Sequence, residues 1–257
     1  MSSAVQQHDN LLSVRNLNKS FGGVKAVNQC SFTVRRNSIT GLIGPNGAGK
    51  TTMFNLITGL LKPQEGEVIF DNENITHWPT HRRAKRGLTR TFQAIRLFPE
   101  LTLVENITVA LKDNKQGIHQ IFVNQKKLQK RLHDEAMELL KSVDLDDKAK
   151  FKAGELSYGQ QKLLEIVRCV ALDPQMILLD EPAAGVNPTM LKLIIALIYK
   201  LQKQGKTVLV IEHDMGFIMN LCEKIVVMDY GKEIAMGPPK KIQKDPKVLK
   251  AYLGRKE

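Results

Sequence analysis

Nine consecutive residues, 44–52, have the types and the spacing that bind a phosphate chain. They fit the pattern of glycine, four residues, glycine, lysine and then serine or threonine. Glycines let backbone amides converge on phosphate oxygens, and a following helix adds partial positive charge at its first turn. The lysine supplies a point charge to the β- and γ-phosphates, and the next hydroxyl can ligate Mg²⁺. The predicted phosphate-binding residues are Gly44, Pro45, Asn46, Gly47, Ala48, Gly49, Lys50, Thr51 and Thr52.

Two adjacent acids, Asp180 and Glu181, follow the continuous apolar run 176–179. In parallel sheets covered by helices, ligands bind at the carboxyl ends of the strands. Asp180 is therefore placed to hold Mg²⁺, usually through water, and Glu181 is placed to polarise a water that attacks a phosphate. A pair of surface acids after a strand is common in isolation, but it is the weaker interpretation beside a phosphate-binding loop.

A second anion site is suggested by Leu156-Ser157-Tyr158-Gly159-Gln160, which directly precedes an amphipathic pattern. Ser157 can serve simply as the N-cap of a helix that starts here. Alternatively, the Ser157 hydroxyl, the Gly159 amide and the helix N-terminus together could hold a γ-phosphate. The residues alone leave these two interpretations equal.

Two further polar residues follow strand patterns. His213 comes after the apolar run Thr207–Ile211, so we expect it at the same sheet edge as Asp180. Gln93 comes after the apparent strand 87–92, and its amide oxygen could reach Mg²⁺ and the attacking water. A single histidine at a strand end is usually structural, and Gln93 alone is equally ambiguous.

The elements that must position these residues alternate along the chain. Apolar runs predict strands at 31–34, Ile39–Ile43, 67–70, 176–179 and Thr207–Ile211, and a hairpin made of Lys224–Asp229 and 232–236. Helical periodicity predicts helices at 51–61, 160–172 and 190–202. This order implies a mostly parallel sheet with helices on both faces.

Between residues 94 and 165 the strand pattern disappears and helical patterns dominate. This stretch predicts a helical lobe inserted into the α/β core. Within it, the basic residues of 126–131 indicate one face of a helix. Residues 112–124 contain glycine, asparagine and lysine, and they predict a loop or irregular structure.

Composition sets broader limits. The chain has 257 residues, 42% of them hydrophobic and 25% charged, as in an ordinary globular domain. No apolar run approaches the roughly 18 residues of a membrane-spanning helix, and residues 1–10 lack the apolar stretch of a secretory signal. Three scattered cysteines favour a reducing, intracellular compartment over a disulfide framework, and the histidines lack zinc-binding spacing. The net charge of +12 favours nucleic acid, anionic lipid or phosphorylated ligands, although a solvated basic surface would also explain it.

In order, the phosphate loop, Gln93, the Leu-Ser-Tyr-Gly-Gln element, the Asp180-Glu181 pair and His213 resemble the ATP-binding cassette (ABC) family of transporter ATPases, over almost the whole chain. Other P-loop classes lack the Leu-Ser-x-Gly-Gln element. The sequence also has no Asn-Lys-x-Asp motif for guanine, which argues against a GTPase.

The resemblance implies ATP and Mg²⁺ as cofactors and an Mg²⁺-dependent ATPase activity. Glu181, His213 and Gln93 would be the catalytic residues, with His213 touching the γ-phosphate and Gln93 linking the nucleotide to a membrane partner. Thr51, Gln93 and Asp180 would surround the metal.

Further ATP contacts are implied on two other segments. Ser157, Gly159 and Gln160 would contact the nucleotide of a second cassette subunit, across a dimer. Phe21, in Lys19-Ser-Phe-Gly-Gly, matches the position of the aromatic residue that stacks on adenine, although a phenylalanine at a strand end can also be structural.

Three longer stretches, 90–98, 181–188 and 245–254, resemble the cassettes of branched-chain amino-acid importers. That group implies a second ABC ATPase subunit, identical or paralogous, and two membrane permease subunits contacted through residues 94–101. It also implies a periplasmic solute-binding protein as an indirect partner, no nucleic acid, and a peripheral location on the cytoplasmic face of the bacterial inner membrane. Two residues depart from the general family pattern: Tyr158 stands where a glycine is usual, and Asn187 stands where the family often has an aspartate.

We therefore predict an α/β P-loop NTPase (RecA-like) core with a mostly parallel sheet, an N-terminal antiparallel β subdomain and an inserted helical subdomain, all within a single ABC ATPase domain, 1–257. The core and its β subdomain would occupy 11–93 and 166–237, the helical subdomain 94–165, and a C-terminal helical extension 238–257. Two alternatives to amino-acid import stay open: the ABC ATPase of lipopolysaccharide export, and a soluble ABC ATPase of iron–sulfur assembly.

Overall fold

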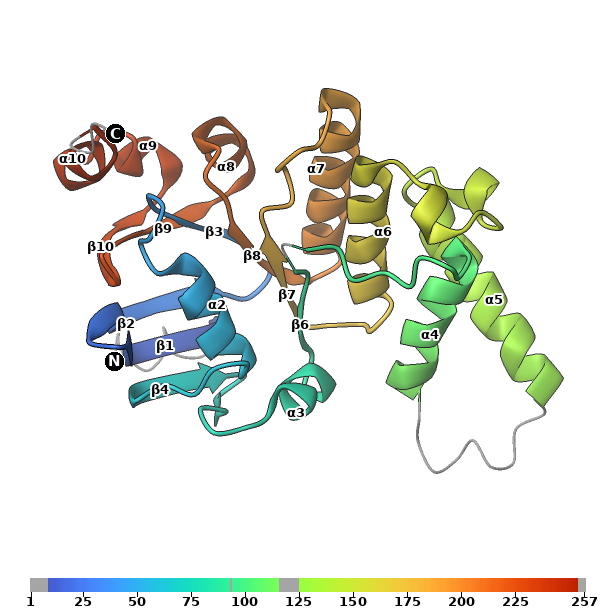
Figure 1. Ribbon diagram of the computed structural model, residues 1–257, viewed down its shortest axis with the longest axis horizontal. Coiled ribbons are helices and arrows are strands. Elements are labelled where there is room, and N and C mark those ends of the chain that lie inside the picture. Colours follow the sequence, from blue (N-terminus) through green and yellow to red (C-terminus); the bar gives the residue numbers. More distant parts are fainter. Residues whose placement is uncertain (1–8, 93, 116–124, 254–257) are drawn as a thin grey trace.

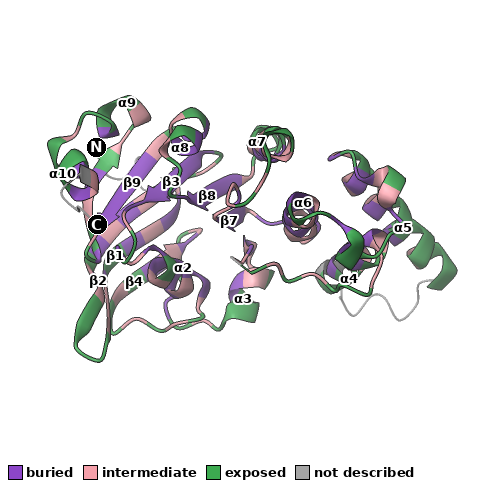
Figure 2. Ribbon diagram, turned by 45° about the horizontal axis from the view of Figure 1, so that its top comes forward, coloured by how far each residue is buried: buried purple, intermediate pink, exposed green. Residues whose placement is uncertain are grey.

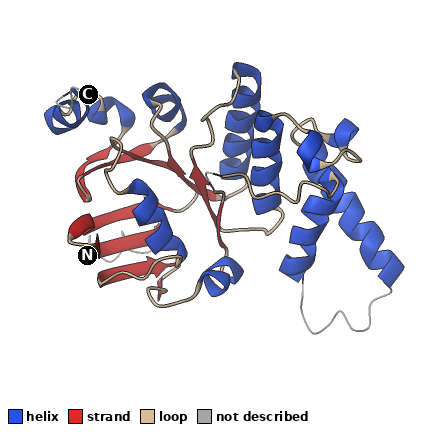
Figure 3. Ribbon diagram, viewed as in Figure 1, coloured by secondary structure: helices blue, strands red, loops and turns tan. Residues whose placement is uncertain are grey.

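A computed structural model describes residues 9–92, 94–115 and 125–253. The strands gather in one half of the molecule, and the helices from the middle of the chain extend from it as a separate lobe (Figures 1 and 3). The predicted site residue Gln93 lies outside the described residues. In the part of the chain that the structure describes, no helix is both long and apolar enough to cross a membrane.

The first sheet is antiparallel and centred on β1. Its strands are β1 (Asn10–Phe21), β2 (Val24–Arg35), β4 (Glu65–Phe70) and β5 (Glu73–Asn74), in the order β2-β1-β4-β5. The predicted strands 31–34 and 67–70 correspond only to the C-terminal parts of β2 and β4. The alternation in β1 is interrupted between Val14 and Leu17, where Asn16 takes a φ of 47° and the register with β2 shifts. This break hid the strand from period-2 analysis.

The second sheet is mostly parallel and carries the predicted apolar strands. In order across the sheet, they are β10 (Lys232–Gly237), β9 (Lys224–Asp229), β3 (Ile39–Ile43), β8 (Thr207–Ile211), β7 (Met176–Asp180) and β6 (Leu88–Arg90). β10 alone pairs antiparallel, as the predicted hairpin partner of β9. β6 has three residues rather than the predicted six, so the chain leaves the sheet before residue 93.

Strands β7 and β8 are apolar except at Asp180 and Thr207, because each face of the sheet packs against a different layer. In β8, Val208 and Val210 face the helices, whereas Leu209 and Ile211 face the layer of β1, β2 and α2. Each of the two strands is buried along its whole length (Figure 2). The structure therefore confirms the predicted mostly parallel sheet, but helices alone cover only one face, and α2 shares the other face with the antiparallel sheet.

The helices of the α/β half follow the strands. They are α2 (Lys50–Thr58), α3 (Thr80–Lys85), α7 (Pro188–Lys203), α8 (Met215–Leu221), α9 (Pro239–Ile242) and α10 (Pro246–Leu253). The predicted helices at 51–61 and 190–202 are confirmed as α2 and α7 with shifted ends. Helix α8 was not predicted, because seven residues are too few for a clear helical period; Asp214 caps it by accepting a hydrogen bond from the Phe217 amide at 3.0 Å.

The helical lobe contains α4 (Leu103–Lys115), α5 (Gln125–Lys141), α6 (Tyr158–Val170) and two short 3-10 helices, Asp146–Lys148 and Ala153–Glu155. The predicted loop at 112–124 was wrong at its start, because α4 continues to Lys115. Buried Ile107, Ala110 and Leu111 recur at helical spacing in α4, and the helix continues from them into the first polar residues that suggested a loop. Residues 116–124 lie outside the described residues.

The three cysteines are free thiols. Burial raises the pKa of Cys30, of Cys169 and of Cys222 to about 12 in each case. The Cys169 thiol also donates to the backbone oxygen of Arg90 at 3.4 Å. None of the three therefore forms a disulfide.

Candidate functional site

The phosphate loop connects β3 to α2 and depends on two close backbone approaches. A Cβ at Gly44 would lie 2.2 Å from the Met228 backbone oxygen, and one at Gly49 would lie 2.2 Å from the Ala26 backbone oxygen. Gly49 has a φ of 99° and is the N-cap residue of α2. Glycine is therefore required at both ends of the loop, for space and, at Gly49, for a left-handed backbone as well.

The ammonium group of Lys50 lies at the centre of this loop. The side chain is 8% exposed, and Nζ donates to the backbone oxygens of Gly44 at 2.7 Å and Pro45 at 3.1 Å. The loop thus curves around a positive charge at the N-terminus of α2, which is the arrangement that attracts a phosphate chain.

Thr51 and Asp180 line the same cavity, of about 340 Å³. Asp180 ends β7 and is 4% exposed, and its carboxylate oxygen lies 2.6 Å from the Arg90 guanidinium. A hydroxyl and a buried carboxylate are hard oxygen ligands, so this donor set fits Mg²⁺. The structure brings together these two predicted metal ligands, while the third, Gln93, lies outside the described residues.

Arg90 is a site residue that sequence analysis did not single out. It ends β6 beside β7, and its guanidinium donates to Asp180 and, at 2.5 Å, to the Asn55 side-chain oxygen. The pair holds the Asp180 carboxylate in place, and a buried charge of this kind needs such a partner. The sequence held no clear signal for this role, because Arg90 is one of 38 lysines and arginines until the strand order places β6 beside β7.

Glu181 and His213 face one another at the carboxyl ends of β7 and β8. His213 Nδ1 lies 3.8 Å from Glu181 Oε1, and the Glu181 and His213 side chains are 24% and 60% exposed. The prediction that His213 shares a sheet edge with the acid pair is confirmed. Both side chains reach solvent, so a water and a phosphate could approach them.

Ser157 caps α6, as the residue pattern suggested. Its hydroxyl accepts from the Gln160 amide at 3.4 Å, and the Gln160 side-chain oxygen accepts from the Ser157 amide at 3.1 Å, which completes a capping box. Gly159 packs against α7, since a Cβ there would lie 2.9 Å from Met190 Cγ. Ser157 and Gln160 do not line the cavity of Thr51 and Asp180. The structure thus separates the Ser157 segment from the metal-ligand pair.

Tyr158 and Asn187, which depart from the family pattern, have local structural roles. The Tyr158 ring lies beside Gly185, where a Cβ would be 3.1 Å from the ring. Asn187 is the N-cap of α7, and its side-chain oxygen accepts from the Met190 amide at 2.9 Å. An aspartate would make the same bond, so the cap tolerates either residue.

Replacement of Asn187 by alanine is expected to lower the free energy of unfolding by about 1 kcal/mol, because the Met190 amide loses its acceptor. For a chain of this size, that corresponds to a decrease of about 3 °C in Tm, measurable by circular dichroism. Asn187→Asp is the matched control and should keep the wild-type Tm. An unchanged Tm in Asn187→Ala would contradict the capping role.

Phe21 is exposed and lies at the hairpin between β1 and β2. The ring is 47% exposed, and Lys19 Nζ lies 5.4 Å from its centroid. Phe21 pairs with Val24, two residues before the Ala26 carbonyl that contacts Gly49. The exposed ring is therefore not part of the core, and its hairpin reaches the phosphate loop.

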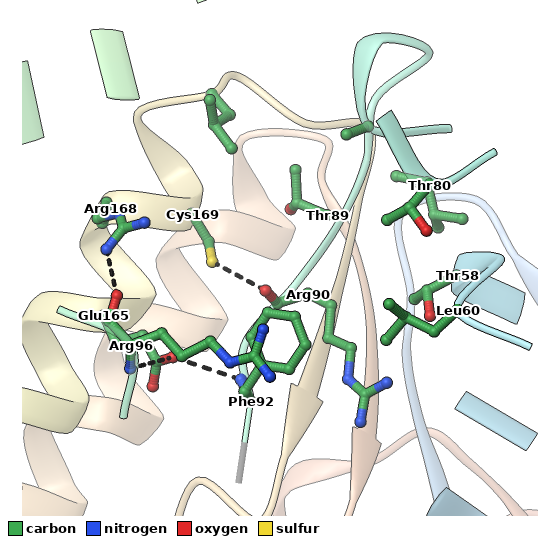
Figure 4. A pocket seen from close by; sticks show the side chains of 13 residues that line it. Thr58, Leu60, Thr80, Thr89, Arg90, Phe92, Arg96, Glu165, Arg168 and Cys169 are labelled. Atoms are coloured by element: carbon green, nitrogen blue, oxygen red, sulfur yellow. Dashed lines mark hydrogen bonds between the residues drawn. The ribbon is translucent and has the colours of Figure 1, made fainter. Parts of the chain in front are cut away.

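The residues on either side of position 93 are anchored to α6. The Glu165 carboxylate accepts from the backbone amides of Phe92 and Arg96, at 3.4 Å each (Figure 4). Burial raises the pKa of Glu165. The Arg96 guanidinium stacks on the Phe92 ring at 3.7 Å, and both side chains line a cavity of about 330 Å³. Phe92 and Arg96 also line the Asp180 cavity, so these two side chains are shared by that cavity and this second, largely apolar one.

Comparison with known proteins gives the family. A family model described as "ABC transporter" matches residues 27–184, and one described as "Branched-chain amino acid ATP-binding cassette transporter" matches residues 232–257. The chain is 43% identical to the high-affinity branched-chain amino acid transport ATP-binding protein BraF of Pseudomonas aeruginosa, over 95% of this chain and 98% of that protein. It is 40% identical to LivG of Escherichia coli K12, with the same coverage.

Solved structures agree with this assignment. A crystal structure of a nucleotide-free ATP-binding cassette from an ABC transporter superposes with a TM-score of 0.84 and is 35% identical, covering 96% of this chain and all of that one. The ADP conformation of a cassette gives a TM-score of 0.82 at the same identity, covering 96% of this chain and 99% of that one. The predicted P-loop cassette fold is confirmed, and the chain belongs to the ABC transporter family as one of its ATP-hydrolysing subunits.

Proposed function

We propose that this chain is the ATP-binding and hydrolysing subunit of an ABC importer, and that it couples ATP-driven dimer closure to the transport of branched-chain amino acids across the inner membrane. The names of its relatives BraF and LivG support this substrate, as does the family match at residues 232–257. The lipopolysaccharide export protein LptB of Haemophilus influenzae is 36% identical, so export is the less well supported alternative.

ATP binding would be the work of the loop at residues 44–52. The loop amides, the N-terminus of α2 and the Lys50 ammonium would hold the β- and γ-phosphates. The exposed Phe21 ring would stack on the adenine. Thr51, Asp180 and Gln93 would hold Mg²⁺, which neutralises charge on the phosphate oxygens when it is bound.

Hydrolysis would take place beside Glu181. The carboxylate accepts a proton from a water whose oxygen bonds to the γ-phosphorus, while the bond from that phosphorus to the β–γ bridging oxygen breaks. The products are ADP and inorganic phosphate. His213, 3.8 Å from Glu181, would contact the γ-phosphate during this step.

A second subunit would complete each site. Ser157, Gly159 and Gln160 begin α6 away from the Thr51 and Asp180 cavity, so we propose that they contact ATP held by the partner cassette. ATP then bridges two subunits, and its binding free energy closes the dimer. Hydrolysis removes the bridge and lets the dimer reopen.

The membrane partner would bind near position 93. Phe98 is 44% exposed, and the buried Asn106 side chain holds it in place by accepting from the Phe98 amide at 2.9 Å. Together with the cavity lined by Phe92 and Arg96, it offers an apolar surface with basic edges. We propose that segments of two membrane permease subunits dock here, with a periplasmic solute-binding protein as an indirect partner. The chain would then be peripheral, on the cytoplasmic face of the inner membrane, with no role for nucleic acid.

The observation that carries this proposal is the convergence of Lys50, the Thr51–Asp180 cavity and the Glu181–His213 pair at one sheet edge. The test is reconstitution of this chain, with a branched-chain permease pair and its binding protein, in proteoliposomes. We expect ATP-dependent uptake of radiolabelled leucine, and none with ADP. ATP hydrolysis without leucine uptake would contradict branched-chain amino acids as the transported substrate. Stimulation of ATP hydrolysis by lipopolysaccharide would favour the alternative role in lipopolysaccharide export.

A further inference from the structure

A buried lysine that has no part in the proposed mechanism contacts the backbone of Glu181. Lys162 is in the second turn of α6 and is 5% exposed. Its Nζ donates to the backbone oxygen of Glu181. The helix that Ser157 caps is therefore tied to the backbone of Glu181 in the same chain.

The backbone of Glu181 needs support at this point. Its φ is +48°, a left-handed conformation that a glutamate rarely adopts. Such strain persists only where the surroundings enforce it, and it gathers at functional sites. The Glu181 amide donates to the Ile211 oxygen at 3.0 Å, and its carbonyl accepts from the Ala184 amide at 3.2 Å and from Lys162.

A buried acid holds the same loop from the other side. Glu212 is 0% exposed, and its carboxylate accepts from the Ala183 amide at 2.7 Å and from the His213 amide at 3.2 Å. Burial lowers the pKa of Lys162 and raises that of Glu212, while the negative charge of Glu212 favours the charged form of Lys162. Lys162 and Glu212 thus hold the loop that contains Glu181 from two sides, through its backbone atoms.

We propose that Lys162 is a positioning residue for hydrolysis: its ammonium fixes the strained Glu181 backbone, so that the carboxylate faces the attacking water. In this role Lys162 acts through the backbone oxygen of Glu181. The inference rests on the proposed role of Glu181 as the base. It also makes α6 the physical link between Ser157 and the catalytic acid of its own chain.

The test compares Lys162→Met with Lys162→Arg in the full-length chain. Lys162→Met should lower kcat for ATP hydrolysis about 30-fold while KM for ATP stays within about twofold, because a small displacement of a catalytic group slows chemistry without weakening binding. Lys162→Arg should recover kcat to within about threefold of wild type, since it restores a cationic donor. Thermal unfolding would establish that each variant is folded.

Lys224→Met is a matched control. Lys224 is also partly buried and donates to a backbone oxygen, that of Thr33 at 3.0 Å, but it lies outside the site. Its replacement should leave kcat unchanged. If Lys162→Met does not fold, Lys162→Gln replaces it, with the same expected loss of kcat.

Three results would overturn the inference: wild-type kcat in a folded Lys162→Met or Lys162→Gln, a loss confined to KM, or an equal loss of kcat in a folded Lys162→Arg. A wild-type chain that binds ATP without hydrolysing it would instead contradict the proposed function. The two failures are therefore distinguishable.

Discussion

Replacing Glu181 with glutamine should lower kcat for ATP hydrolysis about a thousandfold and leave ATP binding intact. Glutamine has nearly the same shape but cannot accept a proton from water, and removal of a general base typically costs between a hundredfold and ten-thousandfold. The hydrogen bonds that Glu181 makes to Ile211, Ala184 and Lys162 use its own backbone atoms, so they survive the change of its side chain. Phosphate release under saturating Mg²⁺-ATP measures the effect.

The same substitution should trap a closed dimer, because ATP that bridges two subunits is no longer removed. Size-exclusion chromatography with light scattering should show a dimer of Glu181→Gln with ATP and a monomer with ADP. Glu138→Gln, an exposed acid on α5, is the control and should behave as wild type. Near-normal hydrolysis by Glu181→Gln would remove this residue from the base role.

Replacing Lys50 with alanine should weaken ATP binding about a hundredfold. A charge-assisted hydrogen bond contributes about 1.5–3 kcal/mol, and roughly 1.4 kcal/mol is a tenfold change in Kd. The substitution also leaves the backbone oxygens of Gly44 and Pro45 without their lysine donor. Isothermal titration calorimetry with a non-hydrolysable ATP analogue measures Kd directly.

Lys85→Ala separates a local effect of Lys50 from a change in net charge. Lys85 is exposed in α3, so its removal lowers the charge of the chain by the same amount without touching the loop. Its Kd should match that of the wild type. Unchanged ATP binding by Lys50→Ala would contradict the assignment of residues 44–52.

The parts of the site that sequence predicted are those encoded by contiguous residues. The phosphate loop, the acid pair and the Ser157 cap each depend on a strand end or helix start that lies within ten residues of the motif. Local pattern therefore fixes both the residue type and its position. The roles of the predicted site residues toward a nucleotide or a metal ion, including those of Phe21, Gln93 and Ser157, stay predictions.

The parts that sequence did not reveal depend on pairs distant along the chain. Arg90 meets Asp180 across neighbouring strands, and Lys162 reaches Glu181 from a packed helix. Each lysine or arginine looks like a surface residue in a chain with 38 of them. Only the strand order and the packing of α6 on the sheet distinguish these two from the rest.

The fold, like the site, was predictable only where a local pattern in the sequence was clear. Apolar runs predicted β3, β7 and β8. The irregular strand β1 and the seven-residue helix α8 were not predicted, because neither shows a hydrophobic period long enough to recognise. The proposed subdomain boundaries stay predictions for a related reason. They fall within continuous packing, where no composition change marks a border.

The two buried thiols, Cys30 and Cys222, and the partly buried Cys169 make this chain a convenient host for cross-linking chemistry. A thiol with a pKa of about 12 is ionised to roughly one part in 100,000 at pH 7, so maleimides and mild oxidants should react with it very slowly. Reporter cysteines introduced on the surface could then be labelled or joined selectively in the natural background. Distances between two copies could be followed through a catalytic cycle without first deleting any native residue.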